Sequence, residues 1–120
     1  MAKIADQKVV QGHDLEMVTN CLSAYLLTIL LEPILIRTAA SSPPLSVRIV
    51  FVVAIMQLGT PAGGMSFDGN GNPNILPRNN RENYMQTKVG GTWLAAEFAN
   101  RLKSKDILSV VSSSDDSQYD

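Results

Sequence analysis

Cysteine and histidine are nearly absent from this chain of 120 residues, which contains one of each. Cys21 alone cannot form a disulfide bridge within the chain, and a lone cysteine is typical of proteins kept in a reducing compartment. A structural zinc site needs several cysteine and histidine ligands, which Cys21 and His13 cannot supply. The sequence therefore excludes a disulfide scaffold and a structural zinc site, and it predicts a cytoplasmic protein.

A surplus of positive charge is also lacking, because 10 Lys and Arg residues face 11 Asp and Glu residues for a formal net charge of −1. Proteins that bind nucleic acids usually carry a clear basic surplus, so we expect no nucleic-acid partner. Hydrophobic residues make up 45% of the chain, which is normal for a globular protein and too high for a disordered one. The length suits one small domain.

Long uninterrupted apolar runs are missing as well. Residues 21–36 are mostly apolar but contain Glu32 and Pro33, and residues 45–58 contain Arg48. A helix that crosses a bilayer needs about 20 mostly apolar residues, and both stretches are shorter than that. The polar N-terminus has no apolar core of a signal peptide. We therefore expect no membrane span and interpret both stretches as buried elements of a soluble fold.

Apolar residues recur at spacings of three and four from about Asp14 to Ala40, which predicts a helix. Asp14 is a candidate N-cap. Pro33 removes a backbone donor and crowds the preceding turn, so we expect it to kink this helix or to end its first part. After a loop rich in Ser and Pro, Val47–Ala54 is a continuous run rich in β-branched residues, typical of a parallel strand that is buried on both faces.

The second half of the chain begins with a long loop, residues 59–83, that is rich in Gly, Asn and Pro. Loops of this length are usually functional or disordered. A second helix is predicted from about Glu82 to Lys103, and a second short strand from Asp106 to Val111. The polar and acidic residues 112–120 are expected to form a disordered tail. This alternation of helices and strands favours an α/β fold.

Tyr84 and Lys88 form the most suggestive pair of side chains for chemistry. Their spacing of four places both on one face of the second predicted helix. An ammonium held beside a phenol favours the phenolate form, and such a tyrosine can exchange a proton with a carbonyl or alcohol oxygen. The alternative is a solvated helix face, which is the more common explanation for an isolated pair of this kind.

Three stretches in order resemble the catalytic half of a short-chain dehydrogenase/reductase. Thr19–Thr28 is similar to the fourth-helix pattern, in which an Asn precedes an apolar segment, and Arg48–Ala54 is similar to the fifth strand. Tyr84–Lys88, continued by apolar residues to Leu102, is similar to the Tyr-x-x-x-Lys helix. The long loop before Tyr84 resembles the retinol-dehydrogenase-like branch, which includes many fungal members. The resemblance extends over about residues 10–111.

This resemblance implies a partial Rossmann-like, doubly wound fold with two long helices and one or two buried parallel strands. It implies a nicotinamide cofactor, NADP or NAD, and a small-molecule carbonyl or alcohol substrate. Tyr84 would be the proton donor or acceptor, and Lys88 would favour its phenolate and hold the nicotinamide ribose. Asn20 would lie at a helix irregularity and support a water relay to Lys88. The three residues would form both the catalytic and the cofactor-binding site.

The chain departs from the family pattern at three points. Ala54 occupies the position of the catalytic serine, and Thr60 or Ser66 from the long loop are candidates to replace its hydroxyl. A Gly-x-Gly-x-x-Gly turn, which binds the cofactor pyrophosphate in Rossmann folds, is absent. Ser112–Ser114 stand where a Pro-Gly motif usually follows the sixth strand. The chain therefore looks like a truncated central segment of such an enzyme, and these departures make an inactive protein a reasonable expectation.

Two alternatives to an active oxidoreductase remain open. The two helices often form the dimer interface in the resembled family, so the chain could be a non-catalytic interaction fragment that associates with itself or with a full-length relative. A truncated or mis-spliced product without a selected function is the other alternative, motivated by the abrupt change to polar residues after Val111. In either active or inactive form, a chain with two strands and unpaired apolar faces is expected to be oligomeric.

Overall fold

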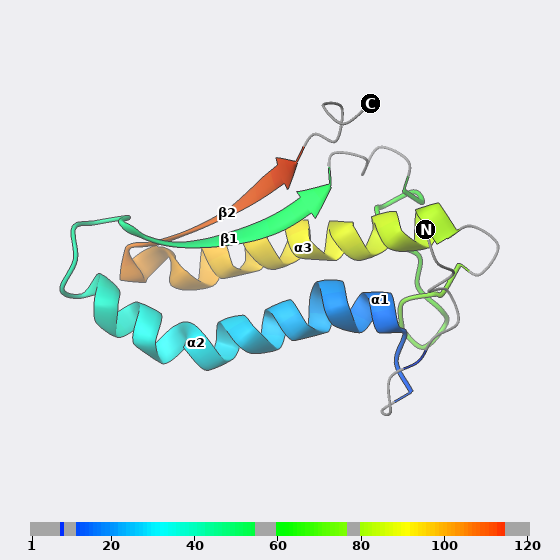
Figure 1. The fold of residues 1–120 in the computed structure, drawn as a ribbon, viewed down its shortest axis with the longest axis horizontal. Coiled ribbons are helices and arrows are strands. Elements are labelled where there is room, and N and C mark those ends of the chain that lie inside the picture. Colours follow the sequence, from blue (N-terminus) through cyan, green and yellow to red (C-terminus); the bar gives the residue numbers. More distant parts are fainter. Residues whose placement is uncertain (1–7, 9–11, 55–59, 77–79, 115–120) are drawn as a thin grey trace.

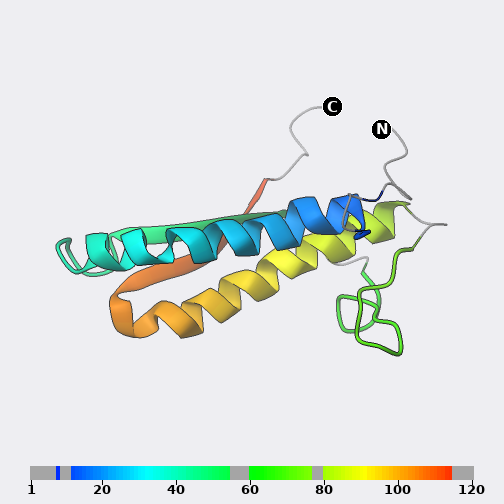
Figure 2. The ribbon, with the colours of Figure 1, turned by 90° about the horizontal axis from the view of Figure 1, so that it is seen from below.

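The computed structural model describes Lys8 and residues 12–54, 60–76 and 80–114. Two long helical segments lie side by side along one face of a two-stranded parallel sheet (Figures 1 and 2). The elements follow one another as α1 (Leu15–Met17), the π-helical η1 (Val18–Leu22), α2 (Ser23–Ala39), β1 (Val47–Ala54), α3 (Asn80–Leu102), the 3₁₀ turn η3 (Lys103–Lys105) and β2 (Ile107–Ser114). The predicted α/β fold class is confirmed, including the partial Rossmann-like arrangement of two helices and two parallel strands.

The first predicted helix is confirmed as the continuous segment α1, η1 and α2. Asp14 is its N-cap, since the Asp14 carboxylate accepts a hydrogen bond from the Met17 backbone N–H at 2.9 Å. The helix runs through Pro33 to Ala39, so the proline does not end it. Pro33 lies on an exposed side of the helix, and its ring is accommodated there without loss of the following turns.

β1 and β2 pair in parallel, with Val47 opposite Ile107 and Ala54 opposite Ser114. The prediction that β1 is buried on both faces is wrong for the described part of the chain. Phe51 and Val53 are buried, whereas Val50 and Val52 are 52% and 65% exposed. The reason is that the helices cover one face of the sheet (Figure 1). Successive side chains of a strand point to opposite faces, so every second side chain of β1 lies on the uncovered face.

β2 extends to Ser114, beyond the predicted strand end at Val111. The prediction that a disordered tail begins at residue 112 is therefore wrong for Ser112–Ser114, and residues 115–120 lie outside the described part of the chain. Serine has little intrinsic preference for strands, but Val52–Ala54 of β1 offers a backbone ladder that these residues complete. Pairing with β1 thus overrides the local composition.

The second helix is confirmed within a few residues of its predicted ends, and residues 80–83 of the predicted long loop belong to α3. The C-terminal half of α3 contributes to the core together with both strands and the end of α2. The buried members of this core are Ala39, Phe51, Ala95, Phe98, Leu102 and Ile107. The rings of Phe51 and Phe98 stack with centroids 6.0 Å apart. α3 is thereby fixed against the sheet along its second half.

The outer face of α2 is apolar and exposed. Its exposed large side chains are Tyr25, Leu26, Leu27, Leu30, Leu31 and Ile34. By length and composition, Leu15–Ala39 is one helical segment of the described chain that could cross a membrane, and 11% of its most apolar window is buried. Glu32 on the same segment pairs with Arg101 of α3, with an N–O distance of 3.0 Å. The absence of a membrane span stays a prediction.

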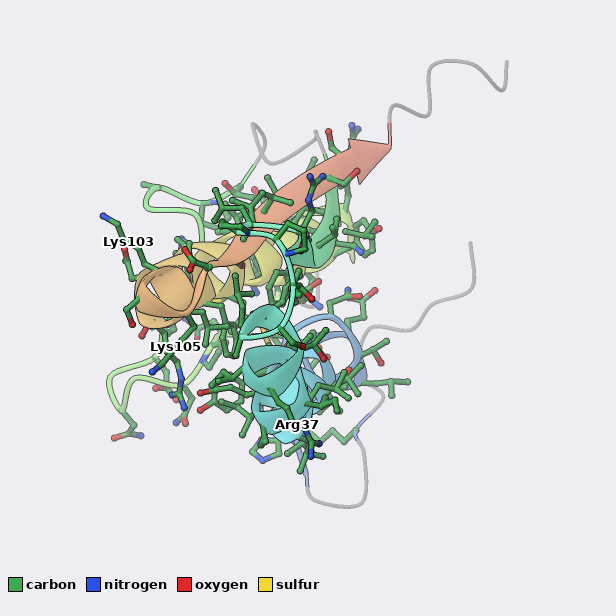
Figure 3. All side chains as sticks on the ribbon, turned by 90° about the vertical axis from the view of Figure 1, so that its left-hand side faces the viewer. Arg37, Lys103 and Lys105 are labelled. Carbon is green, nitrogen blue, oxygen red and sulfur yellow. The ribbon has the colours of Figure 1, made fainter. Side chains whose placement is uncertain are left out.

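Basic residues gather at the end of the molecule where both long helices finish. Figure 3 shows Arg37 at the end of α2, and Lys103 and Lys105 in η3 after α3. Cations at helix C-termini interact favourably with the helix dipole. The carboxyl ends of both strands and the beginning of α3 lie toward the opposite end of the molecule (Figure 1). The candidate site is at that end.

Candidate functional site

Tyr84 and Lys88 lie on the second and third turns of α3. This helix begins near the carboxyl ends of the parallel strands (Figure 1). The Lys88 Nζ is 5.6 Å from the centroid of the Tyr84 ring, a cation–π distance. Both residues are half-buried. The structure thus brings together the pair that the sequence singled out.

Asn20 lies in η1, the π-helical segment that interrupts the first helix. Its Nδ2 donates a hydrogen bond to Thr87 Oγ1 at 2.8 Å, and Thr87 Oγ1 donates to the Tyr84 backbone carbonyl at 2.6 Å. Asn20 is therefore connected to the Tyr84 turn through Thr87. A π-bulge is a frequent feature of functional sites, and the predicted helix irregularity is present at this residue. The water relay from Asn20 to Lys88 stays a prediction.

Three buried polar residues of α3 were not predicted from the sequence. Asn83, Gln86 and Thr87 are 1%, 0% and 0% exposed. Gln86 and Asn83 hold the loop 60–76: Gln86 Oε1 accepts from the Ser66 N–H at 3.2 Å, and Asn83 Oδ1 accepts from the Leu76 N–H at 3.1 Å. Polar residues in a helix usually face solvent. The sequence signal for these contacts was the Asn83 and Gln86 pair itself, because side-chain amides can form hydrogen bonds with the backbone of a neighbouring loop.

Cys21 packs directly on α3 at Gly90. Its thiol donates to the Thr87 backbone carbonyl at 3.0 Å, and a Cβ added at Gly90 would overlap the Cys21 sulfur. Burial raises the pKa of the Cys21 thiol to about 11, while the nearby Lys88 ammonium acts in the opposite direction. Cys21 is therefore a protonated packing residue at neutral pH, and Gly90 allows the two helices to approach closely.

The two candidate replacements for the catalytic hydroxyl are placed differently. Ala54 is the last residue of β1 and pairs with Ser114 of β2. Its methyl side chain offers no hydrogen-bond donor. Ser66 Oγ accepts a hydrogen bond from Asn74 Nδ2 at 2.9 Å, within the loop 60–76. Ser66 thus has a role in holding this loop. Thr60 lies at the start of the same loop and is half-buried.

Sequence comparisons with known proteins indicate the family to which the chain belongs. No family model matches the chain, and no solved structure gives a significant match. A Schizosaccharomyces pombe protein named as an uncharacterized oxidoreductase is 38% identical over 99 residues, which are 82% of this chain and 29% of that protein. A Phomopsis amygdali short-chain dehydrogenase/reductase is 34% identical over 97 residues, 78% of this chain and 28% of its own length.

A third relative, the short-chain dehydrogenase/reductase sthC of Phaeosphaeria nodorum, is 34% identical over 107 residues, 87% of this chain and 33% of its own length. The chain thus spans about a third of the length of the curated relatives that it matches. The matches extend over 78–87% of this chain. Over this span, the chain belongs to the short-chain dehydrogenase/reductase family of oxidoreductases.

Proposed function

We propose that this chain takes part in NAD(P)-dependent hydride transfer between a carbonyl and an alcohol, with Tyr84 as the proton donor or acceptor. The observation that carries the proposal is the Lys88 ammonium, held 5.6 Å from the centroid of the Tyr84 ring on one face of α3. The Tyr84 hydroxyl would exchange the proton with a substrate oxygen, and the Lys88 ammonium lies over the Tyr84 ring.

The donors on this face suit the sugar of a nicotinamide cofactor. Lys88 offers an ammonium and Tyr84 a hydroxyl, both half-buried, and ribose hydroxyls accept hydrogen bonds from such groups. The site also lies near the carboxyl ends of parallel strands, where open α/β sheets bind their ligands. When bound, the reduced cofactor, NADPH or NADH, would supply the hydride to a carbonyl, and the oxidised form would accept it from an alcohol. Lys88 would hold the ribose, and Asn20 would maintain the turn of α3 that carries Tyr84 through its hydrogen bond to Thr87.

Ala54 limits the expected rate. A serine hydroxyl at this position would donate to the substrate oxygen, and loss of one such donor typically costs about 10²–10³ in rate. Tyr84 then has to orient and protonate the same oxygen. We therefore propose a slow oxidoreductase acting on a small carbonyl or alcohol in the cytoplasm.

Calorimetric titration with NADPH and NADH tests this proposal. We expect micromolar binding of at least one cofactor to the unmodified chain. Lys88→Met should weaken it at least about tenfold, because a hydrogen bond from a charged donor is lost. Lys103→Met, in η3 at the other end of α3, should leave the affinity unchanged. No binding at millimolar cofactor, or equal affinity in the Lys88 variant, would contradict the proposal.

A second candidate function is association without catalysis. The observation that favours it is the exposed apolar face of α2, on which Leu26, Leu27 and Leu30 are each more than half exposed. Large exposed apolar patches commonly mark protein interfaces. The occupant would be a second copy of this chain or a full-length relative, and the absence of cofactor binding in the titration would favour this function.

A further inference from the structure

α3 has a second face that the proposed hydride-transfer site does not use. Trp93 follows Tyr84 by nine residues, which at about 100° per residue places it on the opposite side of the helix. A cavity of about 720 Å³ lies on that side, between α3, the α1–η1 segment and the loop 60–76. Its volume is within the range of about 300–1,000 Å³ that is usual for small-molecule sites.

The walls of this cavity are mainly apolar. Met17 and Cys21 contribute from the first helix, Met65 and Phe67 from the loop, and Trp93 from α3. The rings of Phe67 and Trp93 lie nearly parallel, with an interplanar angle of 9° and centroids 6.2 Å apart. Two stacked and exposed aromatic rings form a flat surface on which another planar apolar group can pack.

The loop wall is fixed before any ligand binds. The buried Gln86 side chain accepts from the Ser66 N–H and donates to the Asn74 carbonyl. The buried Asn83 side chain accepts from the Leu76 N–H and donates to Glu16 Oε2 at 2.8 Å, which also ties α1 to α3. A wall held by buried side chains loses little conformational freedom when a ligand binds.

One side chain of the cavity lining has an oxygen without a hydrogen-bond partner in the described part of the chain. Asp14 is 8% exposed, and its Oδ1 accepts from the Met17 N–H. Its Oδ2 is buried without a hydrogen-bond partner in the described part of the chain. The other charged or titratable side chains lining the cavity are Lys8, His13, Cys21 and Glu97. A buried oxygen without a donor is costly, and a ligand that carries a donor would satisfy it.

We propose that this cavity is a binding site for a planar, apolar small molecule that carries one hydrogen-bond donor. The apolar part packs on Phe67 and Trp93, and the donor, a hydroxyl or an ammonium, binds the Asp14 carboxylate. The site is independent of Tyr84 and Lys88, which lie on the other face of α3, so the two proposals can fail separately.

Three matched probes test the proposal by calorimetry: naphthol, its methyl ether and naphthylmethylamine. We expect one-to-one binding of naphthol or the amine, at least about tenfold tighter than the ether, because the ether has no donor. The tighter of the two donors identifies the class as hydroxyl or ammonium. Asp14→Asn retains an N-cap residue, and it should remove this preference over the ether.

Trp93→Ala separates a site from unspecific binding. This exposed side chain can be removed without opening the core, and the affinity for the preferred probe should fall at least about tenfold. The control Leu30→Ala removes an exposed apolar side chain from α2, outside the cavity, and should leave the affinity unchanged. No binding of any probe at millimolar concentration, equal affinity for the ether, or unchanged affinity in Trp93→Ala would overturn the proposal.

Discussion

Replacing Tyr84 with Phe is expected to lower NADPH-dependent carbonyl reduction by about 10²–10⁴-fold, the usual contribution of a general acid. The substitution removes the hydroxyl that exchanges the proton and retains the ring beneath the Lys88 ammonium. The helix and the Asn20–Thr87 contact to the Tyr84 backbone carbonyl are preserved, because neither uses the phenolic oxygen. Oxidation of NADPH with a panel of aldehydes and ketones is the measurement.

Tyr25→Phe is the matched control. Tyr25 is an exposed residue of α2 whose ring packs against Phe98, with centroids 6.1 Å apart. An equivalent phenolic hydroxyl is removed from α2, outside the Tyr84–Lys88 pair, so the reduction rate should not change. If Tyr84→Phe retained the full rate, Tyr84 would have no part in the proton transfer.

Replacing Gly90 with Ala is expected to lower the free energy of unfolding by about 1–3 kcal/mol, the usual cost of overpacking. The new Cβ would overlap the Cys21 sulfur, which is itself held by the Thr87 carbonyl. Alanine favours a helix over glycine by about 1 kcal/mol, but the clash between η1 and α3 outweighs this gain. Urea denaturation followed by circular dichroism measures the difference.

Two further variants identify the clash as the cause. Gly69→Ala, with open space around the added Cβ and an ordinary backbone conformation, should change stability little. Cys21→Ala combined with Gly90→Ala removes the overlapping sulfur, so it should recover most of the stability that Gly90→Ala alone loses. A Gly90→Ala chain as stable as the unmodified one would show that the helices can move apart at no cost.

Local patterns predicted the elements, and tertiary contacts decided their details. The apolar spacing from Asp14 and the β-branched run at Val47–Ala54 identified the first helix and a parallel strand. The sequence could not show that one face of β1 stays open, because this depends on where both helices lie. The extension of β2 through three serines depends in the same way on pairing with β1.

The candidate site shows the same limit. The spacing of Tyr84 and Lys88 predicted that they share a helix face, and the structure adds the approach of the ammonium to the ring. The burial of Gln86 and Thr87 depends on a loop and a π-helical segment that are distant in sequence. The cavity beside Trp93 depends on the same loop, so no periodicity along the chain could have predicted it.

The most direct test of the proposed function is the mapping of NADPH on the chain by amide NMR. We expect the largest shifts at Asn20, Ala54, Tyr84 and Lys88, on the side of α3 near the strand ends. The cavity on the opposite face, marked by Trp93, should remain unperturbed. Shifts confined to Trp93 and the loop 60–76, or no shifts at millimolar NADPH, would contradict the assignment of the Tyr84–Lys88 face as the cofactor site.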